Sequence, residues 1–505
     1  MTSRYWRFAA ALVPMLLLAA LPLAAQGRGR GGFPPQGHPY DPSPTDPPPI
    51  VTHHQIQVNG QTLSYTATAG RLPVPDATGK TEAHIFFVAY TLDGQQASHR
   101  PLSFIYNGGP GEPAIWVHVG GFGPRRIVLN PDGTLPPPPY RMVDNQQTWL
   151  PFTDMVFIDP DGTGYSRAVS AKALRATSRV SGDLQSLGEF IRLYLTRYDR
   201  YSSPLYLAGE SYGTFRSAGL AGYLTQRGIA LNGVILLSSV LDMHTLQESP
   251  DNDLPNVLFL PSYTAIAWYH KKLPADLEKL PLAQVEQQSE AWASHDYLLD
   301  LEKGDALQGA ARQTAIAAMA RFTGLSPQLI DDYNLRISSS VFDATLLQGQ
   351  KEIVGRLDGR MTSFNRTPGV QRPDFDASWV QRPVYTQMFT QYVRDDLGYK
   401  TDEVYGGGID GWAFDVSDNM SQLLESAFAK NPYMKLLLAT GYYDLACPFY
   451  EAEYSMHHLF LPPNLQKNIT VTHYEVGHMI YQDQTARKSL ESDVRTFITG
   501  SEGGK

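Results

Sequence analysis

A serine lies at the centre of a short glycine-flanked motif, Gly209-Glu210-Ser211-Tyr212-Gly213. The apolar run before it, residues 204–208, is typical of a short strand, and small and apolar residues at helical spacing follow it. Glycines on both sides permit a turn too tight for larger side chains, and such a turn exposes the serine hydroxyl at a helix N-terminus. That helix end favours negative charge developing near the serine. The motif therefore indicates a nucleophilic serine, with an ordinary glycine-rich turn as the alternative.

An acid and a base follow further along the chain. Asp444 comes shortly after the apolar run 433–440, and His478 follows the β-rich run 469–476 and a glycine. A serine hydroxyl is a weak nucleophile until a neighbouring base takes its proton. In α/β-hydrolases the three residues occur along the chain as serine, acid and histidine, with the acid and the base on loops after later strands. An ordinary glycine-rich turn would not require this order.

The order assigns a role to each residue. Ser211 is expected to be the nucleophile, His478 the general base and then the general acid, and Asp444 the residue that orients His478. The backbone N–H groups of Tyr212 and Gly109 are expected to form the oxyanion hole, where they stabilise the negative charge of the tetrahedral intermediate.

Several further segments match a known family in their order. The chain resembles the serine carboxypeptidases of the S10 type in Asn107–Gly111, Asp159–Ser166, Gly209–Gly213, Gly441–Cys447 and Gly477–Met479. The resemblance implies an α/β-hydrolase fold, with a mostly parallel central sheet, flanking helices and an inserted, mostly helical cap. It also implies a serine-type carboxypeptidase that needs no cofactor.

The resemblance further implies a site for the free C-terminal carboxylate of a peptide substrate. Asn107, the N–H of Gly108 and Glu210 are expected to form it. Glu210 can hold another carboxylate only if it is protonated, which favours acid pH. Members of the family carry a second glutamate in this site, and Gly121 stands at the corresponding position; His118 is close in sequence and is a candidate substitute. This departure weakens the expectation of strict C-terminal preference and leaves the acyl-transfer machinery intact.

Composition excludes some classes of partner. The 505 residues carry a formal net charge of −9 and no long basic block, which argues against a nucleic-acid partner. The single cysteine, Cys447, excludes an intrachain disulfide and is expected to have a packing role; together with export it suggests a bacterial periplasmic or secreted protein. The paired histidines His53-His54 and His457-His458 lack further ligands at metal-binding spacing, and Asp159–Gly162 lacks the rest of a calcium loop. No metal is expected.

The N-terminus has the pattern of a signal peptide, with arginines before a short apolar run and small residues around Ala25, where cleavage is expected. A Pro/Gly-rich stretch follows and is expected to be a disordered or extended linker. The predicted organisation is a signal peptide at 1–25, a linker at 26–50, the hydrolase core at 51–242 and 406–505, and a mostly helical cap at 243–405.

Alternating strand and helix patterns predict the mostly parallel sheet. An Asn-Gly pair between two strand patterns predicts a hairpin. Strands are expected at 55–58, 61–67, 83–92, 101–106, 154–158 and 232–238, and helices at 183–198, 282–301, 306–322 and from Ser326 onward.

These features predict a secreted serine carboxypeptidase that acts on peptides with a free C-terminus through an acyl-enzyme, favoured at acid pH. The alternatives are an esterase or acyltransferase on the same scaffold, and a catalytically silent binding protein with the hydrolase fold.

Overall fold

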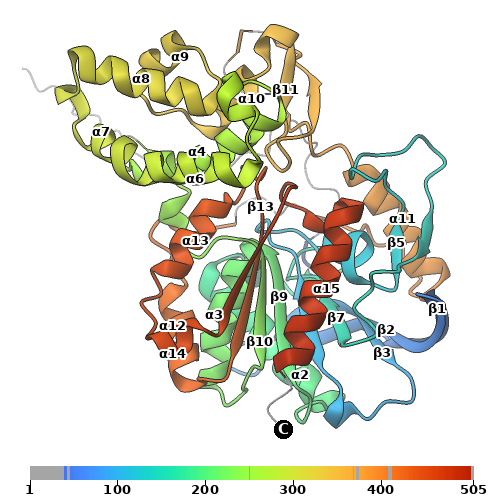
Figure 1. The fold of residues 1–505 in the computed structure, drawn as a ribbon. Helices are drawn as coiled ribbons and strands as arrows, with labels where there is room; N and C mark the ends of the chain where they lie inside the picture. The colour runs from blue at the N-terminus through green and yellow to red at the C-terminus, as the bar shows by residue number, and fades with distance from the viewer. Residues whose placement is uncertain are drawn as a thin grey trace, which may run out of the picture.

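A 10-stranded sheet forms the centre of the molecule (Figure 1). The computed structural model describes residues 39–41, 46–249, 251–367, 369–370, 373, 375–407 and 412–501. The strands run in the order β1-β2-β3-β7-β4-β9-β10-β13-β14, and β8 pairs with β3. They are β1 (Ile50–Val58), β2 (Gln61–Pro75), β3 (Thr81–Leu92), β4 (Leu102–Tyr106), β7 (Asp154–Ile158), β8 (Arg167–Ala168), β9 (Leu205–Ser211), β10 (Gly233–Ser239), β13 (Lys435–Gly441) and β14 (Ile469–Tyr474).

The strands from β7 to β14 are parallel, whereas β1, β2 and β3 join the sheet as an antiparallel edge. The predicted hairpin turns at Asn59 and Gly60, both with positive φ (49° and 80°). Parallel strands are buried on both faces, and β9 follows this rule, since Leu207 packs into the core on one face and Ala208 into the core on the other.

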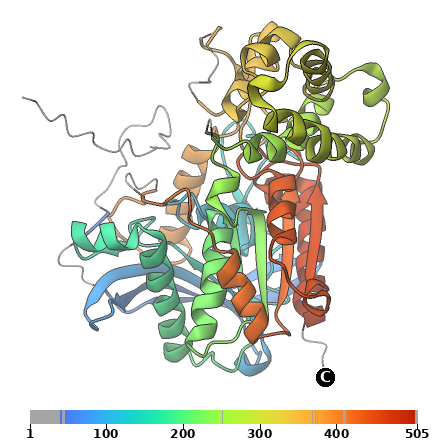
Figure 2. The same cartoon turned by 90° about the vertical axis from the view of Figure 1, so that its left-hand side faces the viewer.

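Helices cover both faces of the sheet (Figure 2). On one side lie α2 (Val180–Arg197), α3 (Tyr212–Gln226), α12 (Ser421–Lys430) and α13 (Phe449–His457). On the other side lie α11 (Arg382–Asp395) and α15 (Gln484–Ser501). The short helices α1 (Ala171–Thr177) and α14 (Pro463–Gln466) complete this part of the chain. The α/β-hydrolase fold predicted from the sequence is thereby confirmed.

A separate, mostly helical lobe sits at the carboxyl ends of the parallel strands and has its own hydrophobic core (Figure 1). Its elements are α4 (Leu254–Tyr269), α5 (Ala275–Glu278), α6 (Leu282–Trp292), α7 (Leu298–Glu302), α8 (Gly309–Thr323), α9 (Pro327–Asp332), α10 (Ser339–Thr345) and the hairpin β11 (Glu352–Val354) with β12 (Thr362–Phe364). We call this lobe the cap.

The cap differs in detail from the predicted helices. The helix expected at 282–301 consists of α6 and α7 joined by a π-helical turn at Ala293–Tyr297. The helix expected at 306–322 begins later, at Gly309, because residues 304–306 form a 3-10 turn. Helix α11 falls within the predicted cap segment 243–405, yet its apolar side chains pack into the core against the sheet.

The predicted signal peptide lies outside the described residues, as does most of the predicted linker. The described linker residues are bound to the core: Asp41 N–H donates to the Ala168 carbonyl at 2.8 Å, and Asp46 contacts both Arg71 and His84. Among the described residues, no helix is both long enough and apolar enough to cross a membrane.

Candidate active site

Ser211 lies at the junction of β9 and α3, in a backbone conformation that residues other than glycine rarely adopt (φ 60°, ψ −132°). The turn is tight, because a Cβ atom placed on Gly209 would lie 2.0 Å from the carbonyl oxygen of Gly213. Ser211 is partly exposed, whereas its neighbours Glu210 and Tyr212 are buried. The turn therefore holds a strained serine at a helix N-terminus, as the motif predicts.

His478 and Asp444 meet at the carboxyl ends of β13 and β14. His478 Nδ1 hydrogen-bonds Asp444 Oδ2 at 2.7 Å, and both side chains are buried. The other carboxylate oxygen of Asp444 accepts hydrogen bonds from the N–H groups of Ala446 and Cys447, at 2.7 and 2.9 Å. With Nδ1 donating to Asp444, the second ring nitrogen of His478 is left free to accept a proton.

The backbone of His478 is held from two sides. Its N–H donates to the carbonyl of Leu357 in the cap at 2.6 Å, and its carbonyl accepts from the hydroxyl of Ser238 at the end of β10 at 2.7 Å. One hydrogen bond to the cap and one from the sheet thus hold the backbone of the proposed base in position.

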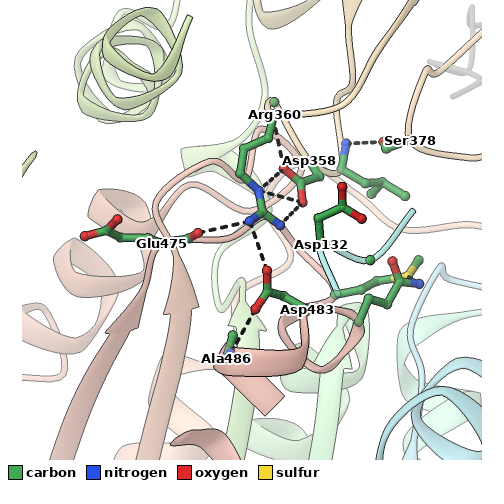
Figure 3. A network of polar contacts seen from close by, with 12 residues as sticks. Asp132, Asp358, Arg360, Ser378, Glu475, Asp483 and Ala486 are labelled. Carbon is green, nitrogen blue, oxygen red and sulfur yellow. Dashed lines mark hydrogen bonds and ion pairs between the residues drawn. The ribbon is translucent and has the colours of Figure 1, made fainter. Parts of the chain in front are cut away.

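Arg360 fastens the same cap segment to the loop that carries His478 (Figure 3). Its guanidinium donates to Asp358 within the cap at 2.7 Å, and to Asp483 and the Glu475 carbonyl of the loop, each at 3.3 Å. These charged groups are mostly buried, with 11–15% of each side chain exposed. A buried network of this kind is sensitive to the loss of one partner.

Asn107 and Glu210 form a buried polar pair beside the elbow. Asn107 Nδ2 donates to Glu210 Oε1 at 3.0 Å, while Asn107 Oδ1 accepts from the N–H of Val117 at 3.2 Å. The Asn107 carbonyl accepts from Arg216 at 2.7 Å, and Arg216 forms a buried ion pair with Asp183, also at 2.7 Å. The orientation of the Asn107 amide is therefore fixed before any ligand binds.

Gly108 brings this loop against the elbow. A Cβ atom at this position would lie 2.4 Å from the backbone nitrogen of Tyr212. Only glycine permits so close an approach. The segment that carries Gly109 and the segment that carries Tyr212 are consequently adjacent, as an oxyanion hole built from both would require.

The environment shifts the pKa values of two site residues. Burial raises the pKa of Glu210 to about 7, although His478, Tyr481 and Asn107 each lower it. Burial favours neutral His478, but the charge and hydrogen bond of Asp444 and the charge of Glu210 outweigh it and raise the histidine pKa above its ordinary value. Glu210 Oε2 is buried and has no hydrogen-bond partner of good geometry among the described residues.

The remaining histidine candidates lie elsewhere. His118 Nε2 hydrogen-bonds the Tyr90 hydroxyl at 2.7 Å and its ring stacks on Phe157, with the ring centroids 4.1 Å apart, so the idea that it substitutes for the missing glutamate is wrong. His473 pairs with Glu453 at 2.7 Å. The ring of His458 stacks on Tyr454, and His53 and His54 bond threonines on the sheet edge.

Two further predicted positions have structural partners. Asp159 accepts from the N–H of Ala114 at 2.9 Å, which ties the segment after the Asn107 loop to the sheet. The Cys447 thiol is buried and contacts the Ser211 hydroxyl, and burial raises its pKa well above the ordinary value.

No group of three or more His, Cys, Asp or Glu side chains that could hold a metal ion occurs in the part of the chain that the structure describes.

Some residues of the site were not predicted. Leu357 acts through its backbone carbonyl, which leaves no signature in the sequence. Tyr481, buried beside Glu210 and Asn107, had two signals: it follows His478 by three residues, and Gly121 leaves space for a large side chain.

A family model supports the resemblance from which these site residues were predicted. The model of the serine carboxypeptidase family matches residues 59–499, most of the chain. The protein therefore belongs to the serine carboxypeptidase family.

Individual relatives match shorter stretches. The pheromone-processing carboxypeptidase KEX1 of Puccinia graminis is 30% identical over 140 residues, which are 27% of this chain and 20% of the relative. The serine carboxypeptidase S10 family member 1 of Dictyostelium discoideum is 27% identical over 154 residues, 30% of this chain and 34% of the relative. The aligned stretches thus span only 20% and 34% of these two relatives. A fungus and an amoeba give no support to the expected bacterial origin.

A solved structure shares the fold over most of its length. The prohormone-processing carboxypeptidase Kex1 of Saccharomyces cerevisiae covers 86% of this chain and 91% of its own, with a TM-score of 0.52 and 16% sequence identity. At this identity the similarity shows the α/β-hydrolase fold alone.

Proposed function

We propose that this protein is a secreted serine carboxypeptidase that releases C-terminal residues from peptides through an acyl-enzyme. The observation that carries the proposal is the buried Asn107–Glu210 pair beside the serine elbow. An esterase needs the serine, histidine and aspartate, but it has no need of a protonated carboxyl group and an amide oriented next to them. A free C-terminal carboxylate does need such partners.

The acyl transfer would follow the order of the catalytic triad. His478 takes the proton of Ser211 as the hydroxyl attacks the scissile carbonyl, and later gives it to the leaving amine. Asp444 orients the imidazole and stabilises its charged form. The N–H groups of Gly109 and Tyr212 stabilise the oxyanion; loss of one such donor typically costs about 3 kcal/mol of transition-state stabilisation.

The two titrating residues have opposite requirements. Glu210 must keep its proton to hold the substrate carboxylate, so peptide turnover should fall as pH rises through about 7, the pKa to which burial raises this group. His478 must be neutral to act as a base, so turnover should fall at low pH. Because Glu210 and His478 interact, the pair titrates as a unit. Peptide turnover is therefore expected to be greatest in mildly acid solution.

Two alternative functions can be distinguished from this one by experiment. An esterase or acyltransferase on the same scaffold would turn over substrates without a carboxylate as readily as peptides, and Gly121 is the residue that favours this alternative. A silent binding protein would leave Ser211 unreactive toward a serine-directed reagent. Secretion rests on the signal-peptide pattern at 1–25 and would be checked by N-terminal sequencing of exported protein.

The substitution Glu210→Gln tests the carboxylate site. Glutamine keeps a hydrogen-bond donor but has no titrating proton, so the fall of peptide kcat/KM above neutral pH should flatten. Ester turnover should keep its maximal rate and follow His478, whose pKa should fall somewhat without the charge of Glu210. The proposal fails if peptide and ester profiles of the unmodified enzyme coincide, or if Glu210→Gln leaves the peptide profile unmoved.

A further inference from the structure

The ring of Tyr481 occupies the space that Gly121 leaves open. A Cβ atom on Gly121 would lie 2.9 Å from Tyr481 Cγ, and one on Gly120 would lie 3.1 Å from Tyr481 Cε2. The two glycines and the tyrosine therefore fit one another: a larger side chain at residue 121 would displace the ring. Gly121 is also the position at which the family resemblance leads one to expect a second acid.

The Tyr481 hydroxyl is buried next to the proposed carboxylate site. The side chain is 1% exposed, and its hydroxyl interacts with both Glu210 and Asn107. Neither Tyr481 Oη nor Glu210 Oε2 makes a hydrogen bond of good geometry with the described residues. Buried polar atoms are costly to leave unpaired. The Tyr481 hydroxyl and the Glu210 carboxyl group lie within reach of each other but in poor hydrogen-bond geometry, and a ligand carboxylate beside the oriented Asn107 amide would give both groups a better partner.

The surroundings fix the tyrosine in place. Arg487 donates to the Tyr481 carbonyl at 2.9 Å, and the ring packs edge-on against Phe122, with the ring centroids 5.3 Å apart. Arg487 and Arg126 form no ion pair among the described residues, and Arg487 lies close enough to Arg126 for their charges to repel. Asp483 offsets part of the Arg487 charge, and the remaining positive charge beside the Tyr481 backbone favours an anionic ligand nearby.

We propose that Tyr481 is a specificity-determining residue whose hydroxyl donates a hydrogen bond to the C-terminal carboxylate of the substrate, together with Asn107 and Glu210. The inference rests on the proposed carboxypeptidase function and adds to it a fourth donor, beside Asn107, the N–H of Gly108 and Glu210. A phenol donor differs from a carboxyl donor because it keeps its proton throughout the working pH range, since burial raises the pKa of Tyr481 well above its ordinary value.

The test is Tyr481→Phe, which keeps the ring and removes the hydroxyl. For an N-blocked dipeptide with a free carboxylate, kcat/KM should fall about 10- to 100-fold, the loss expected for one hydrogen bond to a charged group. Turnover of an N-blocked amino-acid ester should be unchanged, and so should titration of Ser211 with a serine-directed reagent. Tyr474→Phe is the matched control, because its hydroxyl, which is partly buried, donates to Asp493 at 2.6 Å instead. The inference is overturned if Tyr481→Phe leaves the ratio of peptide kcat/KM to ester kcat/KM unchanged, either because neither value changes or because both fall equally.

A binding experiment separates this inference from the proposed function. In the Ser211→Ala background, an N-blocked amino acid should bind more tightly than its amide, and Tyr481→Phe should abolish most of that difference. If the unmodified enzyme releases no C-terminal residue while the binding difference and its loss are observed, the proposed activity is wrong and the carboxylate site stands. If the enzyme is active and Tyr481→Phe leaves the binding difference intact, the role of Tyr481 is wrong and the activity stands.

Discussion

Ser211 and His478 are expected to act as one unit, because a serine hydroxyl attacks a peptide bond only when a base removes its proton. Ser211→Ala should lower kcat by several orders of magnitude and leave the fold intact, and His478→Ala should be nearly as damaging. The double variant should be little worse than either single variant. Steady-state kinetics of the three variants test this. If the loss of activation free energy in the double variant equalled the sum of the losses in the two single variants, the triad would be contradicted.

The serine elbow, the His478–Asp444 pair and the Asn107–Glu210 pair are the parts of the site that the sequence predicts best. Ser211, His478 and Asn107 each stand in short glycine-rich motifs, because the backbone there must turn tightly or approach another segment closely. Tyr481 was missed, since its role depends on the space at Gly121, and two positions 360 residues apart become neighbours only in the folded chain.

At the scale of elements, the hairpin β11–β12 of the cap supports the loop that carries His478. Leu357 accepts from the His478 N–H at 2.6 Å, and Arg360 joins Asp358 in the cap to Asp483 after the histidine (Figure 3). The cap is therefore expected to contribute to catalysis by positioning the base as well as by covering the site.

Arg360→Met should loosen this connection. It leaves Asp358 and Asp483 without their cation, and breaking a buried pair typically costs about 3–5 kcal/mol of stability. We expect kcat to fall about tenfold or more while KM changes little, because misplacing a catalytic group by about 1 Å can cost as much as 100-fold. Thermal unfolding and steady-state kinetics measure the two effects.

Arg321→Met is the matched control in the same lobe. Arg321 pairs with Asp276 at 2.5 Å, and both side chains are well exposed (36% and 61%). Its removal should change neither kcat nor the unfolding temperature appreciably, because exposed pairs contribute little. A loss of stability in Arg360→Met without any change in kcat would show that the network holds the cap but does not position His478.

Elements were predictable where the local pattern determines them. The Asn59-Gly60 hairpin and the strands of the parallel sheet follow from turn residues and apolar runs. The contact between Leu357 and His478 could not be predicted, because a backbone carbonyl carries no sequence signal and the two residues are 121 positions apart. Likewise, α11 has the same amphipathic pattern whether it packs on the cap or on the sheet, so its assignment needed the tertiary structure.

At the scale of the whole molecule, several buried carboxyl groups adapt the fold to acid pH. Burial raises the pKa of Asp159, Asp161 and Glu451 to about 7 each. A carboxyl group with a raised pKa binds more protons in the folded than in the unfolded state between about pH 4 and pH 7, so stability falls as pH rises through this window. His118 opposes this trend below pH 6.5, because burial lowers its pKa to about 3.

The unfolding temperature should therefore be higher at pH 5 than at pH 8, because Glu210 and Glu290 also have pKa values raised to about 7, and these five carboxyl groups outnumber the three histidines whose pKa burial lowers, His54, His118 and His270. Scanning calorimetry at several pH values measures the difference. Asp161→Asn should reduce the pH dependence, because the amide keeps a polar group facing Thr177 without a titrating proton. A protein more stable at pH 8 than at pH 5, or an unchanged slope in Asp161→Asn, would contradict this expectation.

The central claim is that the protein removes residues from the C-terminus of peptides that end in a free carboxylate. The most direct measurement is mass spectrometry of a mixed peptide library incubated with the purified protein, alongside the same peptides with amidated C-termini and with Ser211→Ala as the inactive control. We predict stepwise shortening from the C-terminus of the free peptides, little reaction of the amidated ones and none with Ser211→Ala. Shortening from the N-terminus, internal cleavage, or equal rates for free and amidated peptides would contradict the account.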